Sequence, residues 1–321
     1  MVEKYLSLIE AEIKKEKFGN QPKSLYEPLR YMMALGGKRL RPLFTALSYS
    51  LYRNDVREII PYAVAVEAFH NFTLMHDDIM DKAPLRRGKA TVHERWNVNT
   101  AILSGDVMLV KVYEMFSQLE GSKLRDVLVV FNHCAAKVCE GQQLDMEFEN
   151  RKSVSEAEYL EMIKLKTGVL LGFSLEFGGL LGGASHADRE ALRDFGINIG
   201  IGFQLKDDWL DVYADKEKFG KQVGGDILSN KKTFLLISAL EKAKRNKKVE
   251  LNKWLSANNF SNAEKVKAVT SVYDSLQISS LTEKKIKHFF DKGFACLDRL
   301  SNFQNAKHLK NYIDGLMKRE A

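Results

Sequence analysis

Proline and cysteine are both scarce in this chain of 321 residues. Their scarcity excludes a disulfide-rich scaffold and, over most of the sequence, helices broken by proline. All five prolines lie at or before position 84, so no proline interrupts a helix in the rest of the sequence. Three cysteines, Cys134, Cys139 and Cys296, are too few for a disulfide framework and lack the spacing of a zinc site. We interpret them as inert core thiols of a protein that acts in a reducing cytoplasm.

Long apolar runs are also missing. The most apolar stretch, at 169–184, contains Glu176 and several glycines, and it falls short of the roughly 18 to 20 uninterrupted apolar residues that span a bilayer. We interpret it as a buried helix and expect no transmembrane segment. The N-terminal segment is charged and amphipathic and lacks the apolar core of a signal peptide, so export is not expected.

Apolar residues recur at spacings of three and four, as in Leu6, Ile9 and Ile13, whereas sustained alternation of apolar and polar residues is nearly absent. Glycines and polar clusters divide the chain into about ten or more helices. The longest are predicted at 57–82, 122–150 and 155–181, lengths typical of a large bundle. No linker or shift in composition divides the sequence. We therefore predict an all-α fold in a single domain that covers residues 1–321.

The net charge of +7 and the isoelectric point near 9.0 fit an anionic partner, which includes nucleic acid, a membrane surface and phosphorylated small molecules. The densest basic run, KAKRNKK at 242–248, lies between two amphipathic segments and has no interleaved aromatic residue. We interpret it as a solvated loop between helices and expect no nucleic-acid partner. A salt-dependent DNA shift without magnesium-dependent turnover would favour such a partner.

The DDxxD pattern occurs twice, as DDIMD at 77–81 and as DDWLD at 207–211, each within an otherwise apolar helical context. At about 100° per residue, the first and fifth positions of each motif face the same way, one turn apart. Acidic side chains so close together repel one another and are costly to desolvate unless a cation compensates. Carboxylate oxygens suit Mg²⁺, which usually takes one or two of them together with phosphate oxygens of a substrate. The alternatives are an exposed acidic face or a helix N-terminus, whose dipole favours negative charge.

Basic residues accompany both motifs. The GGKRLRP segment at 36–42 predicts a glycine turn that leads into a helix displaying three cations. Because diphosphate carries more negative charge than magnesium alone would offset, arginine and lysine near both motifs favour a diphosphate site. The cations that accompany the two motifs are Arg86, Arg87, Lys166, Lys221 and Lys231. For any one of them taken alone, the alternative is an ordinary surface cation.

In chain order, GGKRLRP, DDIMD with RRG, KT, FQLKDDWLD, GK and GGDILSNKKT closely resemble the motifs of the trans-prenyl diphosphate synthases, or polyprenyl synthetases. The resemblance covers roughly residues 25–235. It implies mostly antiparallel helices around a central cavity, of the isoprenoid synthase type, and a homodimer. It also implies a prenyl transferase that joins an allylic diphosphate to isopentenyl diphosphate with two or three Mg²⁺ ions.

The resemblance assigns roles to individual residues. The magnesium ligands are Asp77, Asp81, Asp207 and Asp211, with Asp207 favoured over Asp211 as a direct ligand. The isopentenyl diphosphate site consists of Lys38, Arg41, His70 and Arg87. The allylic diphosphate is bound by Arg86, Lys166, Thr167, Gln204, Lys221 and Lys231. The catalytic residues are Asp77, Asp81, Lys166 and Lys221. His70 lies seven residues before Asp77, on the same helix face, although a lone histidine there would also fit the core.

In this family, departing pyrophosphate leaves an allylic cation, the isopentenyl double bond attacks it, and a proton is then lost. Released pyrophosphate is the usual proton acceptor, so we name no side chain as the base. The cation reacts quickly with water and must be shielded from it. The loop after Asp81 and the segment 219–225 are candidate lids.

Product length depends on the fifth position before the first aspartate in this family, and that position is Phe72. With the non-aromatic Thr73 next to it and no insertion in DDIMD, the pattern resembles geranylgeranyl (C20) synthases more than farnesyl (C15) or longer-chain enzymes. Helical geometry alone places Phe72 about 140° from Asp77. Its role therefore rests on the resemblance, and the alternative is a plain core role.

Two related functions are weaker alternatives. A class I terpene cyclase shares the helical bundle and the first aspartate motif but needs no isopentenyl site, so GGKRLRP and the second DDxxD motif argue against it. A catalytically silent partner subunit would not need both acidic motifs and all of the matched cations.

Overall fold

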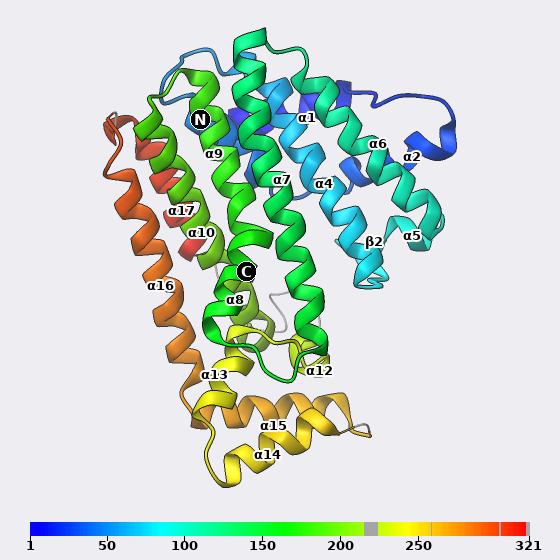
Figure 1. Cartoon of the computed structure of the whole chain (residues 1–321), viewed down its shortest axis with the longest axis vertical. Coiled ribbons are helices and arrows are strands. Elements are labelled where there is room, and N and C mark those ends of the chain that lie inside the picture. Colours follow the sequence, from blue (N-terminus) through cyan, green and yellow to red (C-terminus); the bar gives the residue numbers. More distant parts are fainter. Residues whose placement is uncertain (215–223, 258, 302, 319–321) are drawn as a thin grey trace. The chain divides into compact units, whose positions relative to one another are not determined.

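The computed structural model describes residues 1–214, 224–257, 259–301 and 303–318, and this part of the chain is helical almost throughout, which confirms the all-α class (Figure 1). The exception there is a small antiparallel hairpin that pairs Leu85 with Ala90 and Arg86 with Lys89. In chain order, the elements are α1 (Val2–Lys15), α2 (Lys23–Ala34), α3 (Leu40–Tyr49), η1 (Val56–Glu58), α4 (Ile60–Met80), β1 (Leu85–Arg86), β2 (Lys89–Ala90), α5 (Val92–Arg95), α6 (Val98–Phe116), α7 (Gly121–Asn150), α8 (Glu156–Ile163), η2 (Lys164–Gly168), α9 (Val169–Gly182), α10 (His186–Tyr213), α12 (Gly225–Leu228), α13 (Phe234–Lys242), α14 (Asn246–Ser256), α15 (Asn262–Ser275), α16 (Ile278–Leu297), η3 (Phe303–Ala306) and α17 (Lys307–Lys318).

The long helices lie close to where the sequence predicts them. The predicted helix at 57–82 is α4, and the one at 122–150 is α7. The predicted helix at 155–181 is formed by α8, η2 and α9, which follow one another without a break. The basic run at 242–248 forms a loop between two helices only at 243–245, because α13 ends at Lys242 and α14 already begins at Asn246. That run contains neither glycine nor proline, and lysine is a good helix former.

Contacts divide the chain into two compact units. The first comprises Met1–His133, Phe173–Arg193 and Arg299–Tyr312, and the second comprises Cys134–Gly172, Asp194–Asp298 and Ile313–Ala321. Helices α7, α9, α10 and α17 contribute residues to both. That residues 1–321 form a single domain stays a prediction.

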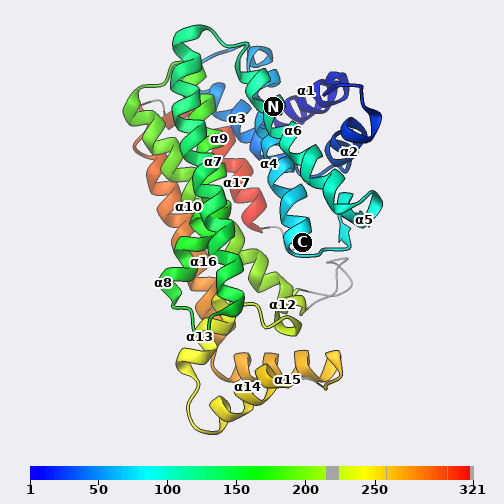
Figure 2. The same cartoon turned by 45° about the vertical axis from the view of Figure 1, so that its right-hand side comes forward.

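The core of the first unit is built around α4, which is apolar on nearly all sides until its last turn and is therefore a buried helix. Helix α6 lies beside it in both ribbon views (Figure 2). Aromatic rings fill the space around them: Phe131 packs against Phe69 and Phe116 with ring centroids 5.0 and 5.1 Å apart. Burying each such side chain contributes about 1.5–3 kcal/mol.

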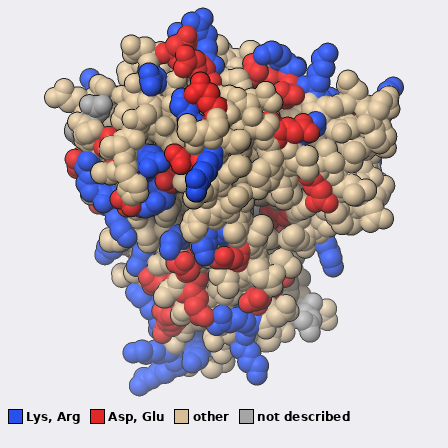
Figure 3. All heavy atoms as spheres, turned by 45° about the horizontal axis from the view of Figure 1, so that its top comes forward, with Lys and Arg blue, Asp and Glu red and all other residues tan. Residues whose placement is uncertain are grey.

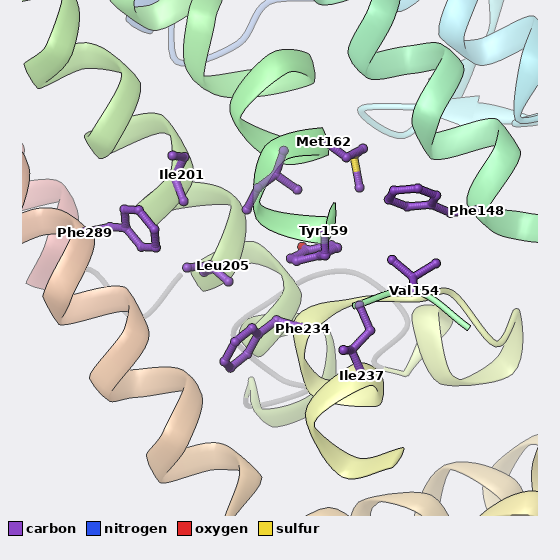
Figure 4. Close-up of a cluster of buried hydrophobic side chains, with 10 residues drawn as sticks. Phe148, Val154, Tyr159, Met162, Ile201, Leu205, Phe234, Ile237 and Phe289 are labelled. Carbon is purple, nitrogen blue, oxygen red and sulfur yellow. The ribbon is translucent and has the colours of Figure 1, made fainter. Parts of the chain in front are cut away.

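The core of the second unit includes a cluster formed by residues of α7, α8, α10, α13 and α16 (Figure 4). Helix α8 enters this cluster from a capping box, in which the Ser155 hydroxyl accepts from the Glu158 backbone and the Glu158 carboxylate accepts from the Ser155 backbone. A second cluster joins α12 and α13 to α14 and α15, which lie side by side in both ribbon views.

The apolar stretch Glu156–Gly182 is long enough to cross a membrane, yet 83% of its most apolar window is buried within the protein. This confirms the interpretation of 169–184 as a buried helix. All three cysteines are free, as expected, and Cys134 and Cys296 are buried. The prediction of a core thiol is wrong for Cys139, which is exposed on α7.

Candidate active site

The first aspartate motif occupies the last turn of α4. The backbone N–H of Asp81 donates to the carbonyl of Asp77 at 2.9 Å, so the two residues lie one turn apart on the same face, as their spacing predicts. Asp81 is exposed and the side chain of Asp77 is 16% exposed. Both carboxylates can therefore be reached by a ligand.

The second residue of this motif, Asp78, has a different role because its side chain turns into the protein and is 1% exposed. Burial raises the pKa of Asp78, and Arg86 opposes that rise by donating Nε–H to both carboxylate oxygens at 2.8 Å. Arg86 also lies 3.6 Å from Asp77. It is carried by β1, next to a hairpin turn in which Arg87 and Gly88 have φ values of 53° and 74°, as a type I′ turn requires.

The second aspartate motif lies at the end of α10 and divides its roles in the same way. Asp207 is exposed and Asp211 is half-buried, whereas Asp208 is 5% exposed. Asp208 accepts hydrogen bonds from the Tyr159 hydroxyl and, at 3.1 Å, from Gln204 Nε2. Burial, together with the charge of Asp226, raises the pKa of Asp208 to about 7.

Both motifs therefore lie at the C-terminal ends of their helices, α4 and α10. This overturns the alternative of a helix N-terminus. The C-terminal end of a helix carries partial negative charge, which disfavours each carboxylate in the last turn by about 0.3–1 kcal/mol. The helix dipole therefore adds to the repulsion among these carboxylates. A cation bound at either helix end would remove this penalty.

Three of the four residues predicted to bind isopentenyl diphosphate lie together in the first unit. Arg41 Nη1 is 2.9 Å from Nε2 of His70, and Arg87 donates to the carbonyl of Gly36. Burial, followed by repulsion from Arg41 and Arg87, keeps the pKa of His70 well below its usual value. Neutral His70 can therefore accept a hydrogen bond from Arg41. The fourth residue, Lys38, is exposed, and among the described residues it forms no hydrogen bond or ion pair with the other three.

The expectation of a helix that displays three cations after the glycine turn is wrong for Arg39. This residue precedes α3 with φ 47°, and its side chain is buried between α1 and α4, 2.8 Å from both Glu10 and Glu67. Its guanidinium also donates to the Met33 carbonyl at 2.7 Å. Arg39 is therefore a structural residue that fixes the turn to three helices.

In the second unit, Lys166 and Thr167 lie on η2, a π-helical turn between α8 and α9. A side chain at Gly141 of α7 would overlap the backbone nitrogen of Lys166, so only glycine allows this close approach. Lys166 pairs with Asp145 at 2.7 Å. The Thr167 hydroxyl donates to Gln204 at 3.1 Å, which links it through Gln204 to Asp208. Such irregular turns often occur at functional sites.

Lys231 belongs to the same group of residues. Burial raises the pKa of Asp226 to about 6, and the charge of Lys231 opposes that rise in both Asp226 and Asp208. The structure thus brings Lys166, Thr167, Gln204 and Lys231 near the second motif. Lys221 and the segment 219–223, which includes most of one candidate lid, lie outside the described residues.

Sequence reasoning missed Asp145, Tyr159 and Asp226. Asp226 lies within GGDILSNKKT, and its place in this matched motif could have marked it as a candidate site residue. Tyr159 lies in an apolar segment and looks like a core residue in the sequence. Its ring is indeed part of the core, and Figure 4 shows it among Met162, Leu205 and Phe234. Only the structure reveals that its hydroxyl contacts Asp208.

Phe72 and Thr73, the predicted chain-length residues, lie in the middle of α4. The ring of Phe72 is half-buried and packs against Phe69 and His76, with centroids 5.7 and 4.8 Å away. The Thr73 hydroxyl donates to the His70 carbonyl at 2.8 Å. Phe72 therefore has ring neighbours that hold it in place.

The donor set suits magnesium bound together with a phosphorylated ligand. Within the described residues, no three carboxylate, imidazole or thiol groups converge as a closed metal cage requires. Each motif instead presents two carboxylates one turn apart. Magnesium keeps most of its waters or binds phosphate oxygens, so one or two carboxylates are sufficient for it.

Known proteins resemble this chain along most of its length. Residues 22–273 match the family described as polyprenyl synthetase. The geranylgeranyl diphosphate synthase of Methanosarcina mazei is 46% identical over 224 residues, which are 69% of this chain and 69% of that protein. The crystal structure of a geranylgeranyl pyrophosphate synthase has a TM-score of 0.95 and 41% identity, covering 100% of this chain and 99% of the other. The polyprenyl synthase of Caulobacter crescentus CB15, solved with calcium and isoprenyl diphosphate, has a TM-score of 0.87 and 28% identity over 99% and 96% of the chains. The predicted isoprenoid synthase fold is therefore confirmed.

Proposed function

This chain belongs to the polyprenyl synthetase family, and we propose that it condenses an allylic diphosphate with isopentenyl diphosphate to form geranylgeranyl diphosphate. The observation that carries the proposal is the form of the two aspartate motifs. Each ends a helix, presents its first and fifth carboxylates, and buries its second. Acids at this end of a helix are stabilised by bound cations.

Asp77, Asp81, Asp207 and Asp211 would hold Mg²⁺, in two or three ions, which would neutralise charge on the departing pyrophosphate. Lys166, Lys221, Lys231 and Arg86 bind the allylic diphosphate, and Thr167 and Gln204 orient it by hydrogen bonds. Arg41, His70, Arg87 and Lys38 bind isopentenyl diphosphate. The isopentenyl double bond attacks the allylic cation, and the proton that is then lost passes to released pyrophosphate.

The Arg41–His70–Arg87 group favours condensation over cyclisation. A terpene cyclase ionises a single diphosphate and has no use for a second cationic group. Here Arg41 and Arg87 are close enough to His70 to depress its pKa, so positive charge is concentrated at one place. Such a concentration is costly in the free protein and indicates a site for a second anion.

A product assay tests the proposal. The purified protein is incubated with labelled isopentenyl diphosphate, Mg²⁺ and each allylic starter in turn, and the dephosphorylated products are sized. We expect magnesium-dependent incorporation and a C20 product. A cyclic hydrocarbon formed without isopentenyl diphosphate would indicate a terpene cyclase, and no incorporation with any starter would indicate a silent subunit.

Phe72 provides a test of product length. Its ring contacts Phe69 and His76, and removing it would leave a space beside α4 that a longer chain can enter. We expect Phe72→Ala to shift the main product beyond C20. Because Phe44→Ala removes a fully buried ring of the same unit, whose ring partner is Tyr312 and not Phe72, it controls for loss of packing alone. An unchanged product distribution in Phe72→Ala would refute the chain-length role and leave Phe72 as a core residue.

We also propose that the protein is a homodimer that acts in the cytoplasm and that residues 1–321 form one domain. Helix α6 supports the dimer, because Leu103 and Val110 lie two turns apart and are 58% and 53% exposed. Tyr113 and Ile102 extend the same face. Figure 3 shows a broad area with few charged side chains on the right of the view, the side on which α6 lies in Figure 1. A second copy of the chain would cover this apolar face.

Val110→Arg is expected to convert the dimer to a monomer, because it places a charge in the apolar face that would be desolvated. Analytical ultracentrifugation measures the change. The matched control is Val249→Arg on α14, where the valine is 69% exposed in the other unit. If both variants sediment like the unaltered protein, the dimer does not form through α6.

A further inference from the structure

The segment that follows the second aspartate motif, Gly224–Asn230, is tied directly to Asp211. The Gly224 N–H donates to the Asp211 carbonyl at 2.6 Å, and the Asp226 N–H donates to the Asp211 carboxylate at 3.0 Å. The second bond uses one carboxylate oxygen of Asp211 and so sets the direction of the other. The position of this segment therefore controls how Asp211 is presented.

On its other side, the same segment rests on α15, which carries none of the motifs recognised in the sequence. Lys265 is 1% exposed, and its ammonium donates to the Leu228 carbonyl at 3.2 Å and to Asn230 Oδ1 at 2.8 Å. Val266 packs where a side chain at Gly224 would lie, since a Cβ there would be 2.7 Å from Val266 Cγ2. Gly224 also has φ 91°, which favours glycine. Neighbouring residues of α15 thus hold both ends of the segment.

Lys265 is an expensive residue for a purely structural contact. Burial lowers its pKa, and no carboxylate pairs with it among the described residues. Its ammonium also lies 4.5 Å from the centre of the Phe260 ring. An apolar side chain would fill the same space without the cost of desolvating a charge. What the ammonium provides in addition is a pair of hydrogen bonds to the segment that carries Asp226 and adjoins Lys231.

We infer that Lys265 is a positioning residue for the second aspartate motif: by holding Leu228 and Asn230, it fixes the Gly224–Asn230 segment and, through it, the Asp211 carboxylate. The inference rests on the proposed function, because it concerns how the magnesium and diphosphate ligands are held. Groups that orient a metal ligand typically change metal affinity about 10- to 100-fold when they are removed.

Two variants and one control separate positioning from packing. Lys265→Met keeps the length and bulk of the side chain and removes its donors. Asn230→Gly removes the acceptor while keeping a residue that tolerates the positive φ of 55° found there. Val272→Ala, on the same helix and 3% exposed in the unaltered protein, weakens packing but leaves the Lys265 ammonium and the Asn230 side chain in place.

The first readout is binding without turnover. Mg²⁺ and pyrophosphate together should raise the melting temperature of the unaltered protein, since a ligand of the folded state stabilises it. We expect Lys265→Met and Asn230→Gly to need about 10-fold more Mg²⁺ for the same rise, whereas Val272→Ala lowers the starting temperature but keeps the rise. The second readout is kinetic: KM for the allylic diphosphate should increase in both variants while KM for isopentenyl diphosphate stays unchanged.

The inference is overturned if both variants are less stable but respond to Mg²⁺ and pyrophosphate as the control does, or if both KM values rise together. Failure of the proposed function would look different, because the unaltered protein would then form no prenyl product. If Lys265→Met does not fold, Asn230→Gly alone decides the outcome.

Discussion

Asp81→Asn is expected to lower turnover by about 1,000-fold and to leave the metal-free protein at least as stable as before. Activity should fall, whereas the stability of the metal-free protein should stay the same or rise. Asparagine keeps the shape of the side chain but loses the charge that binds Mg²⁺. Removing a negative charge from the C-terminal turn of α4 also relieves its repulsion with the helix dipole, by about 0.3–1 kcal/mol. Steady-state kinetics at saturating Mg²⁺ and a melting curve measure the two quantities.

Asp106→Asn is the matched control for this change. Asp106 lies on α6 in the same unit, its side chain is 58% exposed, and its Oδ1 lies 3.8 Å from Nε2 of His76. The same loss of charge at this position should leave turnover unchanged. If Asp81→Asn retained most of its activity, the first motif would not bind the metal and the proposed reaction would lose its main support.

Arg41→Ala is expected to raise KM for isopentenyl diphosphate by about 10- to 100-fold, since a charge-assisted hydrogen bond to a buried anion contributes about 1.5–3 kcal/mol. KM for the allylic diphosphate should change little, because the residues proposed to bind it lie mostly in the second unit. Initial rates with each substrate varied in turn give both constants.

Arg57→Ala controls for the loss of an arginine. The side chain of Arg57 is 76% exposed, and its ion pair, with Asp55 at 2.8 Å, involves no residue of the Arg41–His70–Arg87 group. It should leave both constants unchanged. An equal rise of both KM values in Arg41→Ala would mean that Arg41 supports the fold of the unit instead of recognising one substrate.

The sequence was sufficient for whatever depends on helical periodicity. The spacing of Asp77 and Asp81 predicted their shared face, and the lack of proline after position 84 predicted the long helix α7, because both features are local. Local patterns could not predict which of the clustered charges would be buried. Arg39 looks like Arg41 in the sequence, but Arg39 pairs with Glu10 and Glu67, which lie on helices far from it along the chain.

The same limit applies to the supporting residues of the candidate site. Asp78 and Asp208 are part of the recognised motifs, yet their inward direction depends on partners, Arg86 and Tyr159, supplied by other elements. Lys265 stands in an ordinary amphipathic helix, where a lysine normally faces solvent. Its burial depends on the docking of α15 against the Gly224–Asn230 segment, which no pattern within either segment reveals.

The π-helical turn at Lys164–Gly168 limits how this part of the chain can vary in length. A π turn holds an extra residue compared with an α turn, so deleting one residue there would let the helix resume its regular pitch. A deletion elsewhere in α8 or α9 would rotate every later side chain by about 100° and expose apolar residues. Between Glu156 and Gly182, the stretch most tolerant of shortening is thus the one that orients Lys166 and Thr167. A homologue that lacked this residue would fold normally and yet present these two side chains in another direction.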